Sequence, residues 1–548
     1  MNQLRIVGGT VYDPANGVSG EVRDICIDGG RVVDSVPASA RRLDASGMVV
    51  MPGGVDIHSH VASGSVNLAR RLLPEEHEAD PAAAPALTGG DEARSGTGGT
   101  IPSTFTTGYR YAGLGYTTVF DAAVAPIMAR TSHGELDDTP IVDAGFFVLM
   151  GNDEYLLRLV AAGERAQARE YAAWLLGAAG GYAIKVVNPG GVELWKRGAR
   201  DRVGLDTPVG SERVTPRAIL ETLVEAANGL GLPHAAHIHC NDLGVAGNVA
   251  TTLASMRAVE GRRAHFTHLQ FHAYDAAPDG TRRSGARPLI EYINAHPEIS
   301  GDVGQVMFGA ATTLTADGAV EYLLHKSSGR RWVNVDIELE TGCGVVPHTY
   351  KEKNAVSALQ WVVGLELFLL AADPWRMVLS TDHPNGGSFL AYPELIRLLM
   401  DRGYRDSCLA RVNQTLLAGS AMADGIGREY TLDEIAIVTR AGPARLLGLT
   451  HKGHLGPGAD ADVTVYARDE DVSKMFATPR YVVKGGTLVV EEGQLRRAPR
   501  GQRLHVRPGY DGAVETPLRE FFDRHATVSF RNYPVGDLRD TPIMVGRT

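Results

Sequence analysis

Residues Met51–His60 read MPGGVDIHSH, a short apolar stretch that ends in two histidines two positions apart. Successive side chains of an extended strand point to opposite faces. His58 and His60 therefore lie on one face together with Asp56, while Ile57 lies on the other. The pattern predicts a strand that directs two imidazoles to one spot.

The region that follows alternates short apolar runs with longer segments of helical periodicity. The runs are TTVFDAA, AIKVV, AAHIHC, HFTHLQF, WVNVDIE and MVLSTD, and the helical segments include AILETLVEAANGL and YPELIRLLM. Strands that alternate with helices favour a parallel sheet, and roughly eight such units favour a closed barrel. We therefore expect an α/β protein built around a (β/α)8 TIM-like barrel.

Both ends of the chain have a different pattern, with short strands separated by Gly and Asn turns. RIVGGTVYD and DICIDGGRVV lie near the start, and DADVTVYA and YVVKGGTLVV lie near the end. We expect one small β-sandwich assembled from both termini. The expected parts are 1–52 and 451–500 for the sandwich, 53–450 for the barrel, and 501–548 for a C-terminal extension.

Within the barrel region, residues 64–103 are rich in Pro, Gly and Ala. We interpret them as a long loop over the barrel mouth, partly helical at Asn67–Leu73.

Composition excludes several classes of function. The 548 residues carry a net charge of −10, from 54 basic and 64 acidic side chains, which is unfavourable for a broad nucleic-acid surface. The longest apolar stretch, Ala358–Ala372, is shorter than the roughly 20 residues that cross a bilayer. The N-terminus lacks a signal-peptide pattern, and the four cysteines show no CxxC spacing. We expect a cytoplasmic protein without nucleic-acid or membrane partners.

Several polar residues stand at the carboxyl ends of the predicted strands, where barrels of this kind place their reacting groups. Lys185 lies inside the apolar strand AIKVV, although a lysine is rarely buried unless it is paired or neutralised. A lysine at a strand edge that reaches water is the structural alternative. Asp382 ends a strand before a Pro-Asn-Gly-Gly turn, where an aspartate often only caps the turn.

Histidines recur in HAAHIHCNDLG and HFTHLQFHAY. His239 lies nearer the end of its strand than His237, which makes it the better ligand candidate and leaves His237 as a packing residue or a support behind a ligand. His268 ends the next strand, although a single histidine of this kind is more often a satisfied core residue. His272 lies further out, where it could touch a substrate.

Histidines with a carboxylate and no thiolate suit zinc or a similar divalent ion. Two such ions about 3.5 to 4 Å apart need an anionic bridge, which a cationic lysine cannot provide.

This set of residues resembles the amidohydrolase superfamily in type and order, and GHLGPGADADVTVY after TRAGPARLLGL resembles it too. The matching residues are His58, His60, Lys185, His239, His268 and Asp382. The resemblance implies that CO2 carboxylates Lys185 to a carbamate that bridges two divalent metal ions. The choice of His239 rests on aligning HCND with the family motif, and another register would select His237.

Within the superfamily the chain resembles the family of the amidohydrolase-type subunit of formylmethanofuran dehydrogenase, which has a relative in the formyltransferase/hydrolase complex of methylotrophic bacteria. The stretches that carry this resemblance are GGVDIHSHVA, GTIPSTFTTGYRYAGLGYTTVFDAA, KVVNPGG, HIHCNDLG, THLQFHAY and STDHPNGG. The Ala/Arg/Gly-rich composition favours the methylotroph complex over the dehydrogenase complex.

The resemblance implies hydrolysis of an N-formyl amide to formate and a primary amine, or the reverse. His58, His60, Lys185 and Asp382 would hold one metal ion, while Lys185, His239 and His268 would hold the other. Asp382 would also accept the proton of water and pass it to the leaving amine. Asn188, Asn241 and His272 are candidates for contact with the carrier.

The resemblance also implies sister subunits and a methanofuran-type carrier with a polyglutamate tail. The basic residues available in or near the mouth loop are Arg70, Arg71, Arg94 and Arg110. Two alternatives stay open: a cyclic amide hydrolase of the dihydropyrimidinase or hydantoinase type, and a non-catalytic scaffold.

Overall fold

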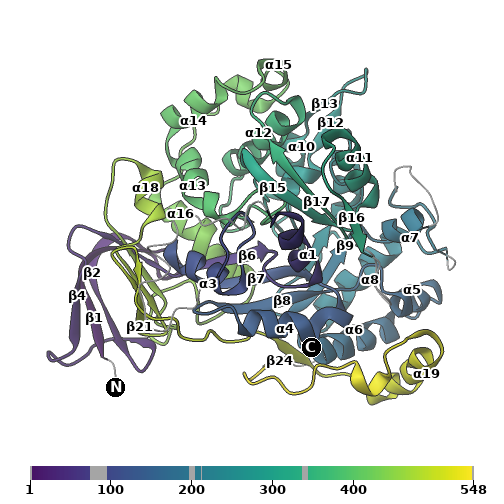
Figure 1. Ribbon diagram of the computed structural model, residues 1–548, viewed down its shortest axis with the longest axis horizontal. Coiled ribbons are helices and arrows are strands. Elements are labelled where there is room, and N and C mark those ends of the chain that lie inside the picture. Colours follow the sequence, from purple (N-terminus) through teal and green to yellow (C-terminus); the bar gives the residue numbers. More distant parts are fainter. Residues whose placement is uncertain (1–2, 75–95, 197–203, 211–212, 336–342, 546–548) are drawn as a thin grey trace.

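A computed structural model describes residues 3–74, 96–196, 204–210, 213–335 and 343–545. Two sheets organise this part of the chain, a parallel sheet in the middle and a separate sheet built from both ends of the chain (Figure 1). The mixed α/β architecture expected from the sequence is confirmed.

The central sheet is parallel and has eight strands. In spatial order they are β6 (Gly54–Ser59), β7 (Tyr116–Val124), β8 (Asp143–Leu149), β9 (Ala183–Val187), β10 (Ala236–His239), β11 (Ala264–Phe266), β14 (Ile299–Asp302) and β18 (Met377–Val378). The sheet curls, and its two edges meet where Ser59 pairs with His383 in an isolated parallel bridge. The carboxyl ends of the strands therefore converge at one end of a TIM-like barrel.

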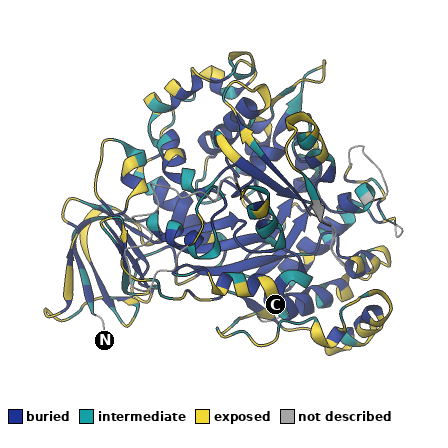
Figure 2. Cartoon of the chain, viewed as in Figure 1, coloured by how far each residue is buried: buried dark blue, intermediate teal, exposed yellow. Residues whose placement is uncertain are grey.

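Helices cover the outside of this sheet, and their buried faces and the strands form one continuous core, while the exposed residues lie on the outer faces (Figure 2). The helices are α3 (Thr104–Gly113), α4 (Ala129–Asp137), α5 (Glu154–Ala161), α6 (Arg165–Ala179), α8 (Pro216–Gly229), α9 (Val249–Ala258), α10 (Ala286–Ala295), α12 (Ala355–Leu370), α13 (Tyr392–Met400), α14 (Arg402–Leu409), α15 (Gln414–Leu417), α16 (Leu432–Ala436) and α17 (Gly442–Leu446).

The start of α8 shows the local causes of these helices. The Thr215 hydroxyl accepts a hydrogen bond from the Ala218 amide at 3.2 Å, and Pro216 occupies the first turn, where no amide hydrogen is needed. The two segments expected to be helical, AILETLVEAANGL and YPELIRLLM, lie in α8 and α13. No helix in the described ranges is long and apolar enough to cross a membrane.

Further elements lie outside the barrel sheet. They are α1 (Gly64–Leu72), α7 (Gly191–Lys196), α11 (Gly318–Ser328), α18 (Val472–Ala477), the antiparallel pair β12 (Tyr274–Ala276) and β13 (Arg282–Ser284), and an antiparallel sheet of β15 (Gly309–Thr315), β16 (Val333–Val335) and β17 (Cys343–Tyr350).

Two of the sequence-based expectations concern these elements. The helix expected at Asn67–Leu73 is α1, whereas 75–95 of the expected mouth loop lies outside the described residues. The run WVNVDIE was wrongly interpreted as a strand of the central sheet. Its described part forms β16 in the antiparallel sheet, because a short apolar run looks the same in either setting.

The terminal segments form one nine-stranded sheet. Its strands are β1 (Leu4–Asp13), β2 (Val18–Asp28), β3 (Arg31–Val33), β4 (Arg41–Asp44), β5 (Val49–Pro52), β19 (Val463–Tyr466), β20 (Tyr481–Lys484), β21 (Thr487–Glu491) and β22 (Gln494–Leu495). β5 pairs with β19 in antiparallel register, which joins the two halves of the chain. The structure thus brings strands from both termini together, as the sequence predicted, and it joins them in one sheet.

A buried group of charges connects this sheet to the barrel. Lys484 Nζ lies 2.6 Å from Asp143 Oδ2 in β8 and 2.9 Å from Asp462 Oδ2 beside β19. Lys452 Nζ contacts Asp143 and lies 3.2 Å from Asp462 Oδ2. We call these four residues the Lys452 cluster.

Residues 501–545 of the last segment follow the barrel, and none of them lines the cavity. The Leu504 amide donates to the Ala144 carbonyl at 2.8 Å and the Val506 amide to the Gly181 carbonyl at 2.9 Å, both near the amino ends of barrel strands. Beyond β23 (Val506–Pro508), α19 (Glu515–His525) packs against α5, and β24 (Ile543–Val545) pairs with β23.

Candidate metal centre

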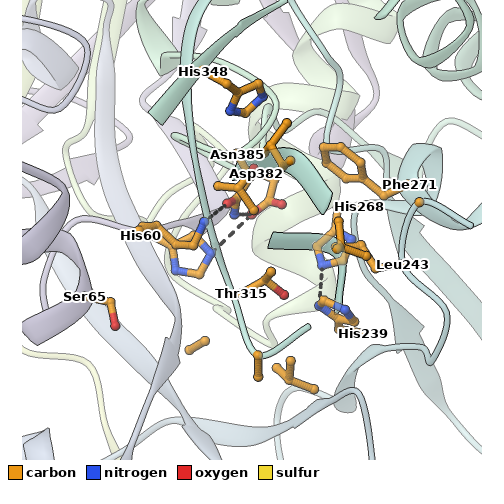
Figure 3. Close-up of a pocket in the computed structure, with 18 of the residues that line it drawn as sticks. His60, Ser65, His239, Leu243, His268, Phe271, Thr315, His348, Asp382 and Asn385 are labelled. Atoms are coloured by element: carbon orange, nitrogen blue, oxygen red, sulfur yellow. Dashed lines mark hydrogen bonds and ion pairs between the residues drawn. The ribbon is translucent and has the colours of Figure 1, made fainter. Parts of the chain in front are cut away.

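The carboxyl ends of the barrel strands surround a cavity of about 1050 Å³ (Figure 3). All six residues predicted to hold metal ions line it, namely His58, His60, Lys185, His239, His268 and Asp382. They lie in or shortly after β6, β9, β10, β11 and β18. The outer wall includes residues of the antiparallel sheet and of α11, namely Thr315, Leu324 and His348. The barrel thus gathers residues from distant parts of the chain at one place.

Asp382 lies against both histidines of the opening motif. Its Oδ1 is 2.9 Å from His58 Nε2 and 3.2 Å from His60 Nε2, and it accepts a hydrogen bond from Asn385 Nδ2 at 2.9 Å. Burial works to raise the pKa of Asp382, but the His268 and His58 rings outweigh it and hold that pKa well below its ordinary value. The carboxylate is therefore ionised and faces the imidazoles.

His239 and His268 form the second part of the centre. His239 Nδ1 lies 3.1 Å from His268 Nε2, and His239 Nε2 lies 2.9 Å from Asp317 Oδ2. His268 has a φ of 34° and Asp382 a φ of 49°, so both sit in the left-handed region shortly after their strands. A Cβ on Gly304, which itself has a φ of +62°, would lie 2.3 Å from His268 Cβ, so this position requires glycine.

Lys185 lies in the floor of the cavity with only 1% of its surface exposed, and its Nζ has no hydrogen-bond partner among the described residues. Burial lowers its pKa to about 8, against the opposing effect of Asp302 and Asp382. An amine in this condition is easily neutralised, and a neutral amine is a nucleophile.

These residues fit divalent metal ions. His239 Nδ1 and His268 Nε2 lie 3.1 Å apart, a separation that suits two nitrogens bound to the same ion at about 2.0 to 2.1 Å each. Ligand atoms of His58, His268 and Asp382 also lie within 4.8 Å of one another. Partnerless buried atoms, Lys185 Nζ and His268 Nδ1, occur in the same place. Imidazole nitrogens with a carboxylate are the donors that zinc prefers.

The two histidines that the sequence left open occupy different places. His239 lines the cavity, whereas His237 lies behind His58, with its Nε2 2.9 Å from His58 Nδ1. This placement favours His239 as the ligand.

The three residues expected to contact a carrier are not part of the cavity lining. Asn241 Nδ2 donates to Asn188 Oδ1 at 2.9 Å, and Asn188 Nδ2 donates to the Ala316 carbonyl, so both amides hold loops together. His272 is fully buried, and its ring centre lies 5.0 Å from that of His239 and 5.2 Å from that of His268. It therefore adjoins the ligand cluster instead of the substrate space.

The arginines expected near the mouth have other surroundings. Arg70 donates to the carbonyls of Pro102 and Val61 and does not line the cavity, while Arg94 lies outside the described residues. Apart from Lys185, the cations that line the described cavity are Arg282, Arg330 and Lys351.

Sequence reasoning also missed Asp317, Asp302 and His348. Asp317 follows strand β15 in TADG, a signal that was available only after β15 was known to face the barrel. His348 lies in the cavity wall, and burial lowers its pKa to about 4. The neutral His348 ring can donate or accept one hydrogen bond there.

Comparison with known proteins agrees with this geometry. Residues 41–490 match the Amidohydrolase family. The chain is 43% identical to Protein FwdA of Methanocaldococcus jannaschii and 39% identical to one of the subunits of the formyltransferase/hydrolase complex Fhc of Methylorubrum extorquens, each over 97% of this chain and 96% of the relative.

A solved structure extends the likeness to three dimensions. It is the crystal structure of the formyltransferase/hydrolase complex (FhcABCD) from Methylorubrum extorquens in complex with methylofuran, which matches with a TM-score of 0.92 and 36% identity over 100% of both chains. The resemblance found in the sequence motifs is thus confirmed over the whole chain, and the protein belongs to the amidohydrolase family.

Proposed function

We propose that this chain is the metal-dependent hydrolase subunit of a formyltransferase/hydrolase complex of one-carbon metabolism, and that it cleaves the N-formyl amide of a formylmethanofuran-type carrier to formate and a primary amine, or catalyses the reverse. The observation that carries the proposal is the convergence of His58, His60, Lys185, His239, His268 and Asp382 on one cavity. The relatives that share the chain's full length supply the substrate class and the complex.

In this proposal two divalent ions, zinc in the first instance, are held by the six residues. His58, His60 and Asp382 would hold one ion and His239 and His268 the other, and Lys185, once carboxylated, would contribute an anionic ligand. The partnerless Nζ of Lys185 supports this role, because carboxylation by CO2 turns a poorly solvated amine into an anion that can bridge cations. When bound, the metal ions lower the pKa of water and polarise the amide carbonyl.

The chain's own residues do the remaining work. Asp382 faces the cavity as a carboxylate, so its side chain accepts the proton of the attacking water and transfers it to the nitrogen of the leaving amine. The histidines keep Asp382 ionised until it accepts that proton from water. The outer walls exclude bulk water from the amide and hold the carrier.

The size of the cavity supports a substrate larger than a formyl group. A volume of about 1050 Å³ is at the upper end for small-molecule sites. Arg282, Arg330 and Lys351 in its lining suit a carrier that bears carboxylates. Contact of the carrier with Asn188, Asn241 and His272 remains a prediction. The two asparagines hold loops together and His272 adjoins the ligand histidines, and these positions argue against contact.

The partners follow from the same relatives. We propose sister subunits of the formyltransferase/hydrolase type, in a complex that contains this chain and works in the cytoplasm. The alternative complex is a formylmethanofuran dehydrogenase, which the 43% identity to Protein FwdA also supports.

The test is to purify the complex from its source, to supply formylmethanofuran and to measure formate release before and after metal removal. We expect release that a chelator abolishes and added zinc restores. Hydrolysis of dihydrouracil or hydantoin without formate release would instead favour a cyclic amide hydrolase. Absence of bound metal from the purified complex would favour the non-catalytic scaffold.

A further inference from the structure

A line of hydrogen-bonded histidines leads from the cavity into the barrel interior. His58 Nδ1 lies 2.9 Å from His237 Nε2, His237 Nδ1 lies 3.0 Å from His234 Nε2, and His234 Nδ1 lies 2.8 Å from the Leu446 carbonyl. All three rings are at most 1% exposed. The line begins at a cavity residue in β6 and ends at α17, outside the barrel sheet.

The Leu446 end of the line fixes the direction in which the hydrogen bonds are donated. A carbonyl oxygen only accepts hydrogen bonds, so His234 Nδ1 must carry the hydrogen that lies between it and Leu446. Burial, reinforced by the nearby His265, lowers the pKa of His234 well below its ordinary value, so the ring is neutral and its Nε2 accepts. His237 Nδ1 therefore donates to His234.

The near end sets the same direction independently. The Thr267 hydroxyl donates to Asp302 Oδ2 at 2.7 Å, because a carboxylate oxygen accepts. The same hydroxyl oxygen contacts His58 Nδ1 and so needs a hydrogen on that nitrogen. His58 Nδ1 thus carries the hydrogen, which the Thr267 oxygen and His237 Nε2 share as acceptors.

We infer that His234 and His237 are positioning residues that keep a hydrogen on His58 Nδ1, so that Nε2 is the nitrogen left to bind a metal ion in the cavity. Both ends of the line place the hydrogen on Nδ1, and Nε2 is the ring nitrogen on the cavity side, beside Asp382. Partners that hold the second nitrogen of a metal-binding histidine commonly set its orientation and basicity. The inference rests on the proposed function, because it makes His58 a metal ligand through Nε2.

The test uses the complex after its metal has been removed. It compares the zinc affinity of the wild-type chain with that of three variants of His237. His237→Leu removes both hydrogen-bonding atoms. His237→Gln places a carbonyl oxygen near the position of Nε2, and His237→Asn places its amide near Nδ1 instead. We expect His237→Leu and His237→Asn to weaken zinc binding by about 10- to 100-fold, while His237→Gln stays close to the wild type.

A second position and a control separate positioning from packing. His234→Leu removes the acceptor of His237 Nδ1, so we expect a smaller loss of zinc affinity in the same direction. His133→Leu removes a buried histidine on α4 that hydrogen-bonds to the Ala179 carbonyl and does not belong to the line, so it should leave zinc affinity unchanged.

The outcomes are distinct. Equal zinc affinity for His237→Leu and the wild type, or an equal loss in all three His237 variants, would overturn the inference and leave the hydrolase proposal standing. A wild-type chain that binds no zinc would overturn both.

Discussion

Asp317 Oδ2 lies 2.9 Å from His239 Nε2, and His239 Nδ1 faces His268 at 3.1 Å. The carboxylate thus lies beside one nitrogen of the ring, while the other nitrogen faces the ligand cluster. Asp317 and His239 come from distant parts of the chain that meet only because β15 and α11 fold back over the barrel.

From this contact we expect Asp317→Ala to weaken zinc binding by about 10- to 100-fold, because a ligating histidine loses the group that orients it. The measurement is a competition titration with a chromophoric chelator. Asp279→Asn, in an exposed turn, is the control for loss of a carboxylate. Wild-type affinity in Asp317→Ala would mean that the pair only packs.

Lys185→Met separates a catalytic role from a structural one. The variant keeps an unbranched apolar chain but removes an amine that is buried without a hydrogen-bond partner. We expect loss of most of the metal and of activity, while the metal-free protein unfolds in urea at an equal or higher midpoint, since a poorly solvated amine no longer opposes folding. Unchanged activity would remove the bridging role, and a lower midpoint would mean that the amine stabilises the fold.

Asp382→Asn tests the proton transfer. The amide keeps the size of the side chain and an oxygen near His58 and His60, so we expect much of the metal to remain. An amide cannot accept the proton of water, so turnover should fall by about 10²- to 10⁴-fold. Formate release under saturating substrate, with metal content measured on the same sample, checks both parts. Near-normal turnover would assign the proton to another group.

Much of the barrel was predictable because its strands are buried on both faces and produce continuous apolar runs. The same pattern gave a wrong prediction at WVNVDIE. Its described part is β16, which belongs to the antiparallel sheet with β15 and β17 and has an equally apolar sequence. The predicted histidines and Asp382 were visible because they stand at or just after strand ends, where the chain becomes polar, and Lys185 because it is a cation inside an apolar strand.

The residues that support those ligands could not be found in this way. Asp302 and Asp317 matter through partners on other strands, and pairing of strands cannot be derived from local pattern. Asn188 looked available for a substrate, but its backbone has a φ of 41° and its amide is used by Asn241 and Ala316. The cations that line the cavity also come from three separate segments outside the expected mouth loop.

The Lys452 cluster predicts how stability depends on pH. Burial works to raise the pKa of Asp143 and of Asp462, but Lys452 and Lys484 outweigh it and lower both values. A carboxyl group with a lowered pKa in the folded state stabilises the protein above its unfolded pKa and loses that contribution as pH falls. We therefore expect the free energy of unfolding to decrease from about pH 5 to about pH 3.

Lys452→Met tests the origin of that decrease, because it removes one cation and leaves buried carboxylates less compensated. We expect a loss of about 3 to 5 kcal/mol at neutral pH and a weaker dependence on acid, measured by urea unfolding. The protein must be free of metal, since histidine ligands release metal in acid as well. Arg165→Met breaks exposed pairs with Glu221 and Glu225 and should change stability by less than about 1 kcal/mol. Equal effects of the two variants would show that the Lys452 cluster contributes no more to stability than a surface pair.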